Sequence, residues 1–122
     1  MSHEIRLEYI GKKEEILGNM EGTFLLQEHN LTIRMPNEID HHQAKYISEM
    51  ADMYIMNGQV VNVIFDFSNT AFMDSSGIGI VVGRYKKVSL VGGKVFVIHA
   101  NRRMEKMLYM SGLMDIVEMI EV

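Results

Sequence analysis

The chain contains no cysteine among its 122 residues. A disulfide framework and a metal site built from thiolates are therefore both excluded. The same absence fits a protein of the reducing cytoplasm, which is where we expect this chain to reside.

Long apolar runs are missing as well. The N-terminal stretch MSHEIRLEYIGKKEE has no apolar core of the kind that signal peptides carry, and no later stretch approaches the length that spans a bilayer. We therefore expect a soluble, cytoplasmic protein without membrane insertion.

Positive charge is not in excess. Twelve basic residues stand against sixteen acidic ones, which gives a net charge of −4, and there is no basic cluster of the kind that binds nucleic acid. We therefore expect no nucleic-acid partner. What the chain does have is 48% apolar residues, which in a chain of 122 predicts a single globular domain whose core is large enough to fold alone.

Strand and helix patterns alternate along the chain from residue 24 onward. The expected elements, in order, are strands at 24–28 and 31–35 around a turn at His29 and Asn30, a helix at 41–56 capped by Asp40, a central strand at 60–67, a helix at 75–90, a strand at 94–98, a helix from Asn101 to Met110, and a last strand at 116–120. This order predicts an α/β fold, a mixed sheet with helices packed on it. The central strand is expected to be buried on both faces, because its apolar residues are nearly continuous.

The most informative stretch joins that central strand to the next helix. Asp74, Ser75 and Ser76 precede the apolar positions of the helix, so each is a candidate for its N-cap. A helix N-terminus presents unpaired N–H groups and about half a positive charge, so it stabilises a side-chain oxygen and equally a phosphate attached to that oxygen. The stretch therefore indicates either a plain N-cap or a serine modification site.

Three segments carry a resemblance to a known family. FMDSSGIGIVVGR at 72–84, with Tyr85 and Lys86 after it, resembles the signature of the STAS domain in bacterial anti-sigma-factor antagonists. The segments 37–42 and 110–113 resemble the strand-to-helix junction and the late helix terminus of that domain. All three occur in the family's order, and the resemblance covers about residues 22–122.

The resemblance implies a function without catalysis and without a cofactor. A protein of this family binds an anti-sigma factor that is also a serine kinase, and so releases a sigma factor. The kinase phosphorylates the serine that directly follows the Asp, which is Ser75 by position, and a serine phosphatase reverses the reaction. The residues that the resemblance assigns to partner binding are Asp40, His41, Asp74, Ser75, Ser76 and Gly77.

Residues 1–21 depart from the family pattern, since the family domain usually begins near the first strand and carries a further helix after the last one. Ile5, Leu7 and Tyr9 alternate like a strand, and 14–20 has the pattern of a short helix. These residues are expected either to cover the surface left bare by the missing C-terminal helix or to form a loosely packed extension. The predicted organisation is thus an extension at 1–21 and a STAS domain at 22–122.

Two other functions compete with the phosphoserine switch. One is a STAS domain that serves another signalling scaffold or a lipid-transport complex. The other is a small hydrolase with Ser75 as nucleophile, but the G-x-S-x-G pattern of such enzymes is absent, because Met73 rather than glycine stands two residues before Ser75. His99 ends a strand and is a conceivable base, although a surface histidine is the simpler interpretation.

Three further patterns have structural explanations. Gly77, Gly79 and Gly83 miss the dinucleotide-binding spacing by one residue, so we attribute them to close packing of their helix against the sheet. His41 and His42 are adjacent and lack a third ligand, so no metal site is predicted. Methionines cluster in the helix at 101–110, where core packing is the first explanation and a deformable partner-binding surface the second.

Overall fold

The computed structural model describes residues 23–121, which form two sheets and three α-helices. The expectations for residues 1–21 fall outside this part of the chain. In order, the elements are β1 (Thr23–Gln27), β2 (Asn30–Arg34), β3 (Glu38–Ile39), α2 (His41–Met56), β4 (Asn62–Asp66), β5 (Phe72–Met73), α3 (Ser75–Val88), the 3₁₀ turn η2 (Ser89–Val91), β6 (Val95–Ile98), α4 (Arg102–Met110), the 3₁₀ turn η3 (Leu113–Asp115) and β7 (Val117–Ile120).

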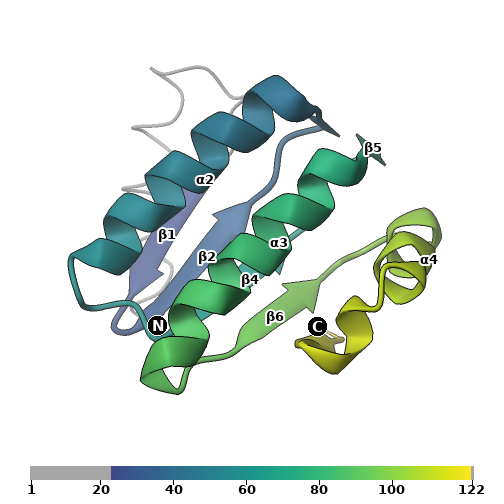
Figure 1. Ribbon diagram of the computed structural model, residues 1–122. Helices are drawn as coiled ribbons and strands as arrows, with labels where there is room; N and C mark the ends of the chain where they lie inside the picture. Colours follow the sequence, from purple (N-terminus) through teal and green to yellow (C-terminus); the bar gives the residue numbers. More distant parts are fainter. Residues whose placement is uncertain (1–22, 122) are drawn as a thin grey trace.

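The main sheet is mixed, as its sequence pattern predicts. Its strand order is β1-β2-β4-β6-β7; β1 is antiparallel to β2, and every later pair is parallel. Each parallel connection passes through a helix, and Figure 1 shows α2 and α3 lying side by side across one face of the sheet. The α/β fold class is therefore confirmed.

The core lies between that face and the helices. Ile33, Phe65 and Val97 stand opposite one another on three neighbouring strands and are fully buried. The buried residues that α2 contributes are Ala44, Ile47 and Ala51. α4 adds its own buried residues, Met104 and Leu108, to the same cluster. The burial of aliphatic and aromatic side chains supplies most of the favourable free energy that holds these layers together.

An ion pair joins the two long helices. Arg84 of α3 is 6% exposed, and its Nε lies 3.0 Å from Oδ1 of Asp52 in α2. Burial lowers the pKa of Arg84, and the nearby Asp52 charge opposes that effect. Because an unpaired buried guanidinium would be costly, the contact with Asp52 offsets part of the cost of burying Arg84.

Several expected boundaries are wrong in informative ways. The hairpin turn is at Glu28 and His29, since Asn30 already pairs with Gln27 as the first residue of β2. The central strand is shorter than its apolar run, and its alternate residue Ile64 is only partly buried, so the predicted burial on both faces is incomplete at this residue. α3 stops at Val88 and continues as η2, where Leu90 is 86% exposed.

No helix within residues 23–121 combines the length and the hydropathy needed to cross a membrane.

Candidate functional site

Two strands of two residues each bring the starts of two helices together. β3 pairs in parallel with β5, with Ile39 opposite Met73, and the backbone N–H of Asp74 donates to the carbonyl of Ile39 at 3.1 Å. Parallel strands end on the same side. Asp40 and Asp74, which follow β3 and β5, therefore lie at the same end of this strand pair. Each begins a helix, so the N-termini of α2 and α3 lie next to each other.

Both helices are capped by the aspartate and not by a serine. Oδ1 of Asp40 accepts from the backbone N–H of Gln43 at 3.0 Å, and Oδ1 of Asp74 accepts from that of Ser76 at 2.7 Å. Of the three candidates for the cap of α3, the structure therefore selects Asp74. Ser75 becomes the first residue of the helix, and its side chain is exposed.

The six residues assigned to partner binding gather at this one place, but they differ in exposure. Asp40, His41 and Ser75 are exposed, whereas Asp74 and Ser76 are partly buried. Gly77 is buried and offers the partner no surface. Five of the six thus line a surface that another protein can reach.

Gly77 is needed for packing beneath this surface. A Cβ at position 77 would overlap the Cγ and Sδ atoms of Met73, so glycine allows α3 to lie directly on β5. The packing explanation is wrong for Gly79 and Gly83, where an added Cβ would meet no atom within 4 Å.

The electrostatics of the site favour a phosphate on Ser75 for the fold and oppose it for a partner. The first turn of α3 presents its positive dipole end, which stabilises an anion at that position. The carboxylates of Asp40 and Asp74 stand beside the same surface. A partner that docks here without phosphate would have to desolvate a much larger negative charge once phosphate is present.

A further pair of side chains at this edge was not anticipated from the sequence. Asp66 ends β4 and His99 follows β6, and Nδ1 of His99 donates to Oδ1 of Asp66 at 2.9 Å. Burial alone would raise the pKa of Asp66, but hydrogen bonds from His99 and Ser68 outweigh it and lower the pKa. The sequence did contain a signal for this pair. Both residues stand at the ends of predicted strands, and neighbouring parallel strands finish at the same edge of a sheet.

His99 is a surface histidine, as expected, but its ring is held by the hydrogen bond to Asp66. Its side chain is 42% exposed, and its backbone has a φ of 60° in the left-handed region, which is uncommon for a residue with a Cβ. Within residues 23–121 no hydrogen bond joins His99 to Ser75.

His41 and His42 are both exposed at the start of α2. In the described part of the chain, no group of three potential ligands is arranged to hold a metal ion.

Comparison with known proteins gives consistent matches. The family model of the STAS domain matches residues 24–122. An anti-sigma F factor antagonist of Paenibacillus polymyxa is 36% identical over 86 residues, which cover 70% of this chain and 74% of the relative.

Two solved structures of SpoIIAA also match. The unphosphorylated form of this anti-sigma factor antagonist has a TM-score of 0.76 at 28% identity, covering 83% of this chain and 87% of SpoIIAA. The phosphorylated form, described as a Bacillus cell fate determinant, has a TM-score of 0.71 at 29% identity, covering 83% and 90%.

Proposed function

The chain belongs to the STAS domain family, and on that basis we propose that it is an anti-sigma factor antagonist, which binds an anti-sigma factor and so releases a sigma factor. The observation that carries the proposal is the exposed Ser75 at the first position of α3, beside the capped N-terminus of α2. This surface is small, rigidly held by backbone pairing and open to a second protein.

We further propose that the anti-sigma factor is a serine kinase and that it phosphorylates Ser75. The geometry favours Ser75 over Ser76, because the Ser75 side chain is exposed whereas Ser76 is partly buried and held by its backbone to the Asp74 cap. A phosphate would add about −1.5 to −2 charges next to Asp74. The modified surface would then repel the partner, and removing water from the phosphate in the interface would cost free energy. Binding would therefore be lost.

The switch needs no rearrangement of the fold. In the relative SpoIIAA, the unphosphorylated and phosphorylated structures both match this chain over the same share of its length. The helix dipole at the start of α3 supports the same expectation here, since it stabilises the phosphate that the partner rejects.

The remaining parts of the proposal follow from the role of a reversible switch. A serine phosphatase would restore the unmodified form, the protein would act in the cytoplasm, and it would bind without catalysing a reaction. Residues 22–122 would be the functional domain and residues 1–21 an extension to it, which the span of the family match supports.

Phosphate mapping tests the assignment. We expect the cognate anti-sigma factor, incubated with ATP and this chain, to place phosphate on Ser75, as located by mass spectrometry of peptides. Ser75→Ala should abolish the modification, and the matched control Ser76→Ala should retain it. Phosphate found on Ser76 alone would overturn the assignment.

A further inference from the structure

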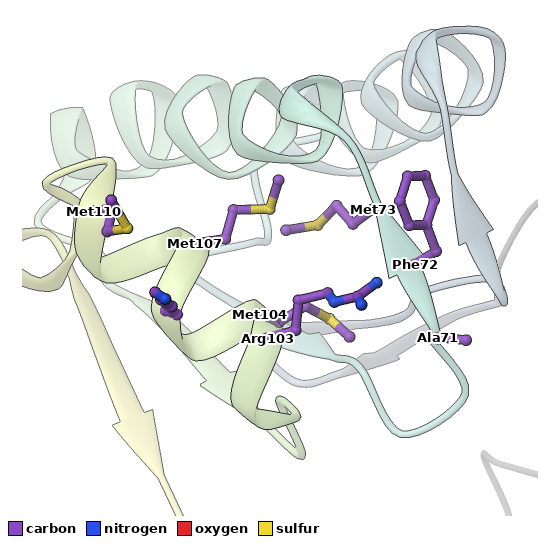
Figure 2. A pocket seen from close by; sticks show the side chains of 8 residues that line it. Ala71, Phe72, Met73, Arg103, Met104, Met107 and Met110 are labelled. Carbon is purple, nitrogen blue, oxygen red and sulfur yellow. The ribbon is translucent and has the colours of Figure 1, made fainter.

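A hollow with an apolar floor lies between β5 and α4, outside the surface formed by the two helix starts (Figure 2). Its volume is about 290 Å³. The residues that line it are Ala71, Phe72 and Met73 from the β5 segment and Arg103, Met104, Lys106, Met107 and Met110 from α4. We refer to this set as the methionine groove.

Half of the residues that line the groove are methionines. Met73 and Met104 are buried and form its base, and Figure 2 shows Met107 reaching from α4 toward Met73. Phe72 and Met110 are large apolar side chains that remain 48% and 73% exposed at its sides. Methionine is unbranched and polarisable, so such a surface adapts to an inserted apolar side chain. Core packing is confirmed for Met104, and the exposed Met110 leaves a partner-binding surface as the second explanation.

The border of the groove is positively charged, in contrast to the chain as a whole. Arg103 and Lys106 are both exposed, and Figure 2 shows Arg103 extending from α4 toward the β5 strand. In the described part of the chain, neither forms an ion pair with a carboxylate. The whole chain carries a net charge of −4, whereas the charged residues that line the groove are these two cations. They match an occupant that carries carboxylates.

The groove is lined by the segment that leads directly to Ser75. Phe72 and Met73 line it, and the next two residues in the chain are Asp74 and Ser75. A protein that covers Ser75 therefore lies close to the groove, whose lining residue Met73 is two residues before Ser75 in the chain. The two surfaces carry opposite charge, acidic at the helix starts and basic at the groove, and such a pair favours a single orientation of the partner.

We propose that the methionine groove is a second docking site for the anti-sigma factor, and that it accepts an apolar side chain from a segment of that partner whose neighbouring carboxylates pair with Arg103 and Lys106. This inference rests on the proposed function, because it assigns the groove to the same partner. The Ser75 surface would switch the complex on and off, and the groove would add affinity and orientation that do not depend on phosphate.

Calorimetric titration of the purified cognate anti-sigma factor into the unphosphorylated chain tests the proposal. Arg103→Glu and Met110→Glu change exposed side chains and should each weaken binding about tenfold or more, because they repel the partner's carboxylates or charge the groove. The matched control is Lys86→Glu, which makes the same charge change at an exposed lysine near the other end of α3. Its affinity should stay within about twofold of the parent. Added salt should weaken the parent complex more steeply than the Arg103→Glu complex.

A parallel titration with Ser75→Asp separates the two hypotheses. If Ser75→Asp abolishes binding while both groove variants bind like the parent, the groove proposal is wrong and the proposed function stands. If the unmodified parent does not bind the anti-sigma factor at all, both are wrong. Self-association in sedimentation experiments that disappears in Met110→Glu, with unchanged affinity for the anti-sigma factor, would assign the groove to a second copy of the chain and overturn the proposal. Thermal unfolding of each variant verifies that it is folded.

Discussion

At the scale of single residues, Asp74 and Ser75 have separate tasks although they are adjacent. Asp74 supplies the oxygen that caps α3, and Ser75 supplies an exposed hydroxyl at the first helical position. The cap contributes to the stability of the fold, whereas the exposed hydroxyl takes no part in the cap. Substitutions can therefore test folding and binding independently.

Replacing Ser75 by Asp should mimic the charged state without damaging the fold. A carboxylate in the first turn of a helix is favourable by about 0.3 to 1 kcal/mol, so the free energy of unfolding should stay level or rise slightly. Affinity for the anti-sigma factor should fall about tenfold or more, since an unpaired charge buried in an interface is costly. Ser75→Asn, which is similar in size but uncharged, is the control. Equal affinities of the Asp variant and the parent would rule out charge as the switch.

Asp74→Asn separates the cap from the charge. The amide oxygen of Asn can still accept the hydrogen bond from Ser76, and Asn is as good an N-cap as Asp, so we expect a native circular-dichroism spectrum and a loss of stability below about 1 kcal/mol. Phosphorylation of Ser75 or binding of the anti-sigma factor should nevertheless weaken, because the charge beside the hydroxyl is gone. Kinetics and affinity equal to those of the parent would show that Asp74 acts only as a cap.

At the scale of elements, close contact between backbones limits which glycines can be replaced. Gly93 lies between η2 and β6, and a Cβ there would overlap the carbonyl oxygen of Val61, a backbone atom that cannot turn aside. Gly83 lies inside α3, where a Cβ would meet open space. One glycine is required by packing, and the other only weakens its helix.

Alanine at these two positions should therefore change stability in opposite directions. Gly93→Ala should lower the free energy of unfolding by about 1 to 3 kcal/mol, because the strand must move to relieve the overlap. Gly83→Ala should raise it by up to about 1 kcal/mol, since alanine is the better helix former. Urea unfolding of both variants measures the difference. Destabilisation by Gly83→Ala would contradict the open surroundings seen at that position.

At the scale of the whole molecule, the residues of the proposed site lie at one edge of the sheet. The parallel strands β2, β4 and β6 all finish there, and open α/β sheets commonly place binding sites beyond the carboxyl ends of their strands. The Asp66–His99 hydrogen bond joins the ends of β4 and β6 at this edge. Loss of that link should loosen the segment that leads from β4 to Ser75.

Acid should reveal the contribution of Asp66 to global stability. Its pKa is lowered in the folded protein from an ordinary value of 3.8, so its stabilising effect is present above that value and disappears as the pH falls through the lower, folded-state pKa. The stability difference between the parent and Asp66→Asn should therefore be largest near about pH 7 and shrink toward about pH 3. Urea unfolding at several pH values measures it. A difference that does not depend on pH would exclude the ionised carboxylate as the cause.

The features that the sequence alone determined are those whose partners lie close along the chain. Asp40, Asp74 and Asn101 cap their helices by accepting hydrogen bonds from residues two or three positions ahead. The helix starts at 41, 75 and 102 can therefore be predicted from the local sequence. The alternation of strands and helices likewise follows from local hydrophobic periodicity. Ser75 could be identified as a candidate for the same reason, since its place at a helix start is local.

Only the tertiary structure decided which of these local features meet. Asp40 lies beside Asp74 because β3 pairs with β5, two strands too short to produce a periodic signal. His99 donates to Asp66 across 33 positions of sequence, and α4 closes the methionine groove against β5. The three glycines of α3 look alike in sequence, yet only Gly77 meets the side chain of Met73. Contacts between distant segments depend on how strands register and helices pack, and a local pattern carries no information about either.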